Sequence, residues 1–224
     1  MSAPPMIPTI VGTLTDLSTM DYLDAYRHDT AFMHNTLIRA FNQIGAKARK
    51  VLPVEMASFA KYVDAFCENT IIFPRLAEFI PLNGEDNTTV LEYLERVEQW
   101  VREAVQLPEK ADPIELIAAM EDMAPVFSKN MHEQLDHMSP SALGAAVSGP
   151  ELRTLVNNDI AWIAQNSRME YFLPFLVLHH DCSTNEIWPS LPDAARSVLP
   201  ELVAANPECW QYAPFNLAGR PYTL

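Results

Sequence analysis

Apolar side chains recur at steps of three and four residues in four long segments, which is the spacing of an amphipathic helix. The pattern predicts helices over residues 18–44, 53–79, 87–107 and 112–138, the third of them beginning at Asn87 or Thr88. Four such helices with short connections bury their apolar stripes most completely as an up-down bundle. We therefore expect an all-α fold built on a four-helix bundle over residues 18–138.

Local sequence signals support two of these boundaries. Asp112 is a good N-cap residue, and Pro113 and Glu115 follow it at the positions of a first-turn proline and a capping box. Ser18 is the expected start of the first helix, and Gly45 is its expected end, because glycine commonly follows the last helical turn.

The remaining third of the chain has a different pattern. Residues 139–149 are rich in small residues and predict a loop, and residues 150–166 predict one shorter helix. From Met169 onward prolines recur, which predicts a mostly irregular tail. Because the tail also contains Trp188, Trp210 and Tyr212, we expect it to wrap around the bundle and cover it. We interpret residues 1–224 as a single domain.

The composition excludes some partners. The chain is 49% hydrophobic with a net charge of −14, so it can form a real core but repels phosphate backbones and anionic lipid headgroups. No apolar run approaches the roughly 18 residues of a membrane span. We therefore expect neither nucleic-acid binding nor membrane insertion, and a monomer or homodimer.

The three cysteines, Cys67, Cys182 and Cys209, form no CxxC pair or cluster with histidine. They are interpreted as reduced, packed thiols. The N-terminal segment has no signal-peptide or transit-peptide pattern, so we expect a cytoplasmic protein.

Six motifs stand out along the chain: MHNTLIRAFNQI (33–44), FCENTIIFPRL (66–76), MAPVFSKNMHEQL (123–135), LPFLVLHHD (173–181), WPSLP (188–192) and CWQYAPFNLAGRPYTL (209–224). In this order they resemble motifs of the fungal hemerythrin-like (HHE cation-binding) proteins. The resemblance implies an up-down bundle that holds a metal, typically di-iron, through histidines and carboxylates on facing helices.

Most of the implied metal ligands are missing from this chain. The matching positions retain His34, Glu68 and His132, whereas the others hold Asn69, Tyr93, Asn130 and Gln134. The retained three, with Asp64 as a fourth candidate, would suit one iron ion only if all of them point inward. The resemblance thus implies a hemerythrin-like fold with a degenerate metal site, for which iron is the alternative to no cofactor.

Loss of the ligands predicts an apolar cavity in the bundle centre with a few neutral hydrogen-bonding groups, which is typical of a small-molecule site. The predicted catalytic candidates are His132, Tyr93, Asn130, Asp64 and Glu68. The predicted substrate-binding residues are His34, Phe66, Asn69, Trp100, Phe127, Met131 and Gln134. The alternative for the aromatic and methionine residues is that they only fill the core.

The favoured function is a cofactor-free cyclisation of the Diels–Alder type, or an isomerisation, of an apolar secondary metabolite. Such a reaction needs a shaped pocket and one donor aimed at a carbonyl. The chain lacks the phosphate-binding, dinucleotide-binding, nucleophile-elbow and zinc motifs of other enzyme classes. The alternatives are a metal-binding or oxygen-handling iron protein and a non-catalytic metabolite-binding protein.

Two polar groups of residues have a second interpretation. Asp64 and Glu68 share a helix face at i, i+4, where they either act as a general base or are simply solvated. His179, His180 and Asp181 are interpreted as a buried hydrogen-bond network that attaches the tail to the bundle.

Overall fold

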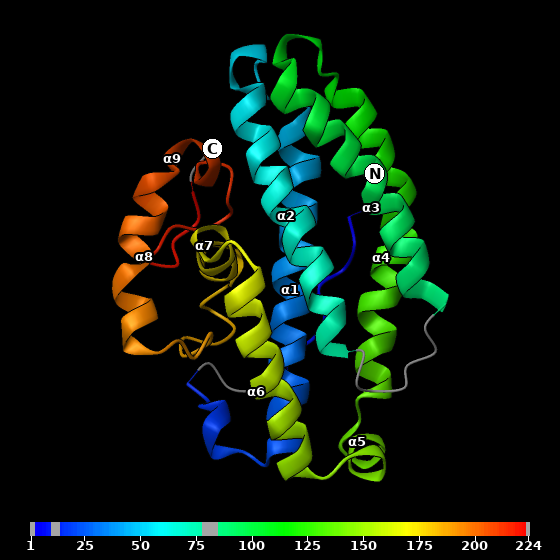
Figure 1. Ribbon diagram of the computed structural model, residues 1–224, viewed down its shortest axis with the longest axis vertical. Helices are drawn as coiled ribbons and strands as arrows, with labels where there is room; N and C mark the ends of the chain where they lie inside the picture. Colours follow the sequence, from blue (N-terminus) through cyan, green and yellow to red (C-terminus); the bar gives the residue numbers. More distant parts are fainter. Residues whose placement is uncertain (1–2, 10–13, 78–84, 223–224) are drawn as a thin grey trace.

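The computed structural model describes residues 3–9, 14–77 and 85–222. Within these residues every regular element is helical, apart from an isolated bridge between Phe215 and Pro221. The long helices are α1 (Tyr22–Ala48), α2 (Met56–Ala77), α3 (Glu85–Gln106) and α4 (Pro113–His137). Helix α1 contacts α2 and α4, and α3 contacts the same two helices, so the four form a closed ring around a shared core (Figure 1). The all-α prediction is confirmed.

The ends of α1 differ from the prediction. Ser18 lies in a separate 3₁₀ turn, Leu17–Thr19, and the N-cap of α1 is Asp21, whose carboxylate accepts the Leu23 N–H at 3.0 Å. At the other end α1 continues through Gly45 to Ala48, which is fully buried. A glycine inside a helix costs about 1 kcal/mol relative to alanine. The last turn of α1 offsets that cost, because it adds helical hydrogen bonds and buries the side chain of Ala48.

The predicted boundaries of the other long helices are closer to the structure. Asp112 caps α4 as predicted, and its carboxylate accepts the Ile114 N–H at 2.8 Å. A capping box would require a bond from the next N–H, that of Glu115, to the Asp112 side chain. Short 3₁₀ turns, Pro53–Glu55 and Pro108–Lys110, precede α2 and follow α3. The predicted end of the second helix, Phe79, lies outside the described residues.

The C-terminal part is more helical than predicted. Residues 139–149 contain helix α5 (Pro140–Ala146) and are not only a loop. Helix α6 (Gly149–Asn166) corresponds to the shorter helix that was predicted over residues 150–166. The supposedly irregular tail contains α7 (Met169–His179), α8 (Asp193–Ala205) and α9 (Pro207–Trp210). Prolines lie inside α7 and α8. Another proline lies in the first turn of α9, and only at such a position does the missing N–H cost little.

These C-terminal helices form a second layer on one side of the ring. Helices α6 and α7 contact both α1 and α2, α9 contacts α2, and α8 packs on α7 (Figure 1). Trp188, Trp210 and Tyr212 in this part of the chain are buried. The prediction that an aromatic tail covers the bundle is therefore confirmed, although helices do much of the covering.

Candidate functional site

A cavity of about 470 Å³ lies between α1 and the second layer, and we call it the α1 pocket. Its walls come from α1, α6, α7, Met138 and residues 188–195. Most of the lining side chains are apolar, and they include Met33, Leu173 and Trp188. Ile160 on α6 also lines the pocket and is 57% exposed, so the pocket reaches the surface beside α6. A volume of this size is within the usual range of roughly 300–1,000 Å³ for small-molecule sites.

Asp29 on α1 is the acidic residue among the described residues that line this pocket. Its Oδ1 accepts a hydrogen bond from the Trp188 indole Nε1–H at 2.6 Å. Burial raises the pKa of the Asp29 carboxyl above its ordinary value, and the hydrogen bond from Trp188 opposes this shift. In the part of the chain that the structure describes, no lysine or arginine pairs with Asp29. A carboxyl group surrounded by apolar walls is therefore available to a bound molecule.

Trp188 is held in place from two sides. The Asn185 Oδ1 accepts the backbone N–H of both Ile187 (2.9 Å) and Trp188 (2.8 Å). The Trp188 ring packs at 4.8 Å from the His180 ring and at 5.6 Å from the Phe32 ring, measured between centroids. These contacts position the indole so that its N–H donates to Asp29, and this hydrogen bond orients the Asp29 carboxyl group.

His34, a predicted substrate-binding residue, also lines the α1 pocket. Its Nδ1 lies 3.0 Å from the carbonyl oxygen of Met131 on α4, so Nδ1 carries the proton and donates it. Burial lowers the pKa of His34 to about 4, against the opposing effect of its hydrogen bonds to Met131 and Gln134. The imidazole is thus neutral at pH 7, and its part in binding stays a prediction.

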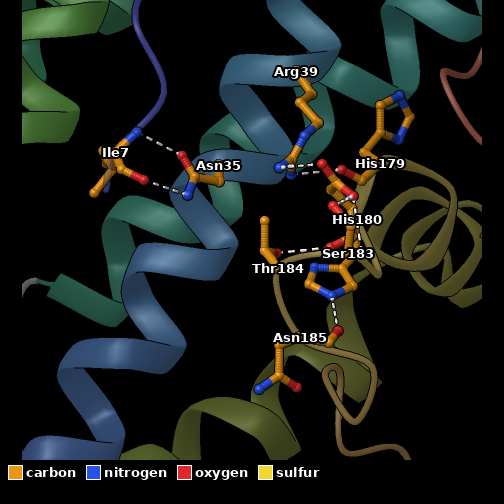
Figure 2. A network of polar contacts seen from close by, with 9 residues as sticks. Ile7, Asn35, Arg39, His179, His180, Ser183, Thr184 and Asn185 are labelled. Atoms are coloured by element: carbon orange, nitrogen blue, oxygen red, sulfur yellow. Dashed lines mark hydrogen bonds and ion pairs between the residues drawn. The ribbon is translucent and has the colours of Figure 1, made fainter. Parts of the chain in front are cut away.

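The histidines at the end of α7 form the network that the sequence predicted (Figure 2). The Tyr62 hydroxyl donates to His179 Nε2 at 2.7 Å, since His179 Nδ1 donates to the Phe175 carbonyl at 2.8 Å. Arg39 donates to the His179 carbonyl at 3.2 Å and lies 3.6 Å from the Asp181 carboxylate. These contacts join the tail to α1 and α2, so this prediction is confirmed.

The α1 pocket does not lie in the bundle centre, where a cavity was predicted. Phe127 stacks on Phe41 with centroids 5.0 Å apart, Phe66 packs edge-on against both, and all three rings are fully buried. Trp100 donates its indole N–H to the Asp112 carbonyl at 2.9 Å. Phe66, Trp100 and Phe127 therefore fill the core, which was the stated alternative to a role in substrate binding.

The polar candidates of the bundle centre include side chains that form hydrogen bonds within their own helices. Asn69 Nδ2 donates to the Ala65 carbonyl at 2.7 Å, and Gln134 Nε2 donates to Asn130 Oδ1 at 2.9 Å. Tyr93 is partly buried, with the Arg96 guanidinium 5.9 Å from its ring centroid. These four residues lie outside the α1 pocket, and their predicted roles in binding or catalysis gain no support from this geometry.

His132 on α4 does not line the α1 pocket, unlike His34 on α1. Its Nε2 is 3.2 Å from the carbonyl oxygen of Pro5 in the N-terminal segment. The same segment runs along α1, where Asn35 accepts the Ile7 N–H at 2.8 Å and donates to the Ile7 carbonyl at 3.0 Å (Figure 2). His132 is thus a contact of this segment.

Asp64 and Glu68 form an ion-pair cluster with Arg168, which precedes α7. Arg168 Nη2 lies 2.7 Å from a carboxylate oxygen of each, and the side chains of Arg168 and Asp64 are 45% and 41% exposed. The two carboxylates therefore link α2 to the second layer at the surface. They occupy no pocket described here and have no contact that indicates a catalytic base.

We expect Asp64→Asn to lower the free energy of unfolding by less than about 1 kcal/mol, because the Arg168 and Asp64 side chains are 45% and 41% exposed and exposed ion pairs contribute little in water. Urea unfolding at low and high salt measures the effect, which should shrink as salt screens the pair. A loss of several kcal/mol that salt does not change would contradict this account.

The alternative metal ligands are not brought together. His34 faces Met131, Glu68 pairs with Arg168, and His132 contacts Pro5. Across residues 3–9, 14–77 and 85–222, no three histidine, cysteine, aspartate or glutamate side chains cluster closely enough to share a metal ion. The expectation of an iron site at these three residues therefore has no geometric support.

Sequence reasoning missed Asp29, Trp188 and the α1 pocket itself. A signal for Asp29 was present, because it lies three residues after Tyr26 and four before Met33, next to the apolar stripe of α1. Its partner Trp188 is 159 residues away, and no local pattern indicates that pairing.

Comparison of the chain with protein-family models, with curated proteins and with solved structures finds no match. The hemerythrin-like resemblance therefore stays a prediction from the motifs. All three cysteines are free thiols, as expected. None of the described helices combines the length and apolarity needed to cross a membrane.

Proposed function

We propose that the chain binds an apolar small molecule in the α1 pocket and catalyses its cofactor-independent cyclisation or isomerisation. The observation that carries the proposal is a pocket of about 470 Å³ whose largely apolar walls contain the carboxyl group of Asp29. Apolar walls select a hydrophobic molecule, and one convergent polar group orients it. The proposed reaction site is thus beside the four-helix ring rather than at its centre.

The chemistry proposed for Asp29 needs no co-reactant. In an isomerisation, the carboxylate takes a proton from one carbon of the substrate and returns it to another, so atoms and charge balance. The raised pKa of Asp29 brings it closer to the working pH, where a general acid or base is most effective. In a cyclisation, the walls hold the reacting ends together, and the carboxyl stabilises charge that develops between them.

We also propose that the α1–α4 ring is a hemerythrin-like bundle whose metal chemistry has been replaced, in a protein of fungal secondary metabolism. Two facts support this: the order of the sequence motifs and the closed contacts among the four long helices. The second layer, which the tail motifs largely build, then supplies the walls of the new site.

The test is incubation of the purified full chain with two apolar probes, a β,γ-unsaturated ketone for isomerisation and a linear polyene bearing a dienophile for cyclisation. We expect a rate and stereochemical outcome different from those in buffer with at least one of them. Asp29→Asn should lower that rate by roughly 10²–10⁴-fold, the usual contribution of a general acid or base.

Asp136→Asn is the matched control, because it makes the same change at an exposed carboxylate near the end of α4. Its rate should equal that of the unaltered chain. Rates and products identical to buffer with both probes would overturn the catalytic proposal. Binding without turnover would instead identify a carrier of the same class of molecule.

A further inference from the structure

We infer that the ligand of the α1 pocket is a lipophilic amine, whose ammonium group pairs with the Asp29 carboxylate while its hydrocarbon part fills the apolar walls. The inference rests on the proposed function, since it concerns the same pocket, and of the two proposed reactions it favours the cyclisation, in which Asp29 stabilises charge and does not abstract a proton. It goes further by giving the substrate a charge and a binding orientation.

The first argument is the charge of the pocket. Three of the described residues that line it can titrate: Tyr26, Asp29 and His34. Burial raises the pKa of Tyr26 and lowers the pKa of His34 to about 4, so both side chains are neutral at pH 7. Asp29 is therefore the lining residue that can carry a full charge, and that charge is negative.

The second argument is the missing counter-charge. Asp29 Oδ1 accepts the Trp188 N–H, and no described residue donates a hydrogen bond to Oδ2. Asp29 is half-buried, and a carboxylate partly withdrawn from water is stabilised by a neighbouring positive charge. A ligand ammonium supplies both the missing positive charge and a donor for Oδ2.

The third argument is the character of the surrounding walls. The rings of Tyr26, Phe172 and Trp188 line the same pocket, and aromatic faces attract organic cations. Met33, Met138 and Met169 add flexible, polarisable side chains that adapt to a hydrocarbon of irregular shape. A small hydrophilic cation would leave these walls unfilled, so the fitting ligand has an amine at one end and a bulky apolar body.

The opposite charge is disfavoured by the same features. A fatty acid would place a second carboxylate beside Asp29, and none of the described side chains that line the pocket is cationic, so nothing among them offsets the repulsion. The overall net charge of −14 likewise attracts cations to the protein and repels anions.

The experiment uses decylamine, decanol and decanoate, which share one chain and differ in charge, each below its critical micelle concentration. Dissociation constants are measured by calorimetry at neutral pH for the full chain, Asp29→Asn and Asp136→Asn. Both variants raise the net charge by one unit, so Asp136→Asn corrects for general attraction of cations to an acidic protein.

We expect the unaltered chain and Asp136→Asn to bind decylamine at least about tenfold more tightly than decanol, with decanoate the weakest. Asp29→Asn should remove the preference for decylamine and leave the decanol affinity nearly unchanged. Decanol binding as tightly as decylamine, or a preference that survives in Asp29→Asn, would overturn the amine inference and leave the proposed function standing. If none of the three probes binds, both the inference and the proposed function fall.

Discussion

Replacing Phe127 with alanine lowers the free energy of unfolding by about 3–5 kcal/mol, the usual range for a phenylalanine deleted from a packed core. Phe127 is fully buried, stacks on Phe41 at 5.0 Å and meets Phe66 edge-on at 6.1 Å. The substitution removes a ring that contacts α1 and α2 at once, and neighbouring aromatic rings cannot collapse into the gap. Urea unfolding followed by circular dichroism measures the loss.

The matched control for Phe127 is Ile114→Ala on the same helix. Ile114 is 70% exposed, so its truncation should change the free energy of unfolding by about 0.5 kcal/mol or less. A loss below about 1 kcal/mol for Phe127→Ala would contradict the packed bundle centre. It would also indicate a loosely packed centre with room for a bound molecule.

Acidification from pH 7 to pH 4 lowers the free energy of unfolding by roughly 3 kcal/mol for each of His34 and His179, at 1.36 kcal/mol per pKa unit. Burial lowers the pKa of His34 to about 4 and that of His179 to about 3, from an ordinary value of 6.5. Below pH 6.5 these two histidines bind protons in the unfolded chain but stay neutral in the folded chain until the pH nears their lowered pKa values. The stability from these two groups is therefore complete above pH 6.5 and is lost as the pH falls toward the folded values.

Other groups modify this slope. Asp29 works in the opposite direction, because a carboxyl with a raised pKa favours the folded state as the pH falls. Asp181, whose pKa is lowered overall by its bonds to Ser183 and by Arg39 against the effect of burial, adds to the acid loss. The expected net result is a protein that unfolds readily near pH 4.

Unfolding free energies measured at half-unit steps of pH test the acid prediction. His179→Gln should give a shallower slope between pH 6.5 and pH 4 than the unaltered chain, whatever its stability at pH 7. His137→Gln, at an exposed histidine at the end of α4, is the surface control. The same slope in His179→Gln and in the unaltered chain would show that His179 does not resist protonation.

The sequence by itself determined the features that depend on neighbouring residues. The apolar period of the four long segments predicted α1 to α4, and Asp112 was correctly identified as the cap of α4. The aromatic residues of the tail predicted that it covers the bundle, and the paired histidines of the tail predicted a buried network. Periodicity, capping and aromatic content are local properties, so the chain reveals them directly.

Tertiary structure decided the rest. Helix α1 passes through Gly45, and α7 and α8 contain prolines, because packing against other helices outweighs weak local propensities. The sequence could not show whether the ring centre was hollow, since that depends on how Phe41, Phe66 and Phe127 interlock.

The location of the site was likewise a tertiary outcome. Asp64 and Glu68 looked equally suited to catalysis until Arg168, a hundred residues away from Glu68, was seen to pair with them. Asp29 was not among the predicted site residues, because only the fold brings it to Trp188. A carboxyl group acquires its chemistry from the charge and solvent around it, and only the folded chain assembles that environment.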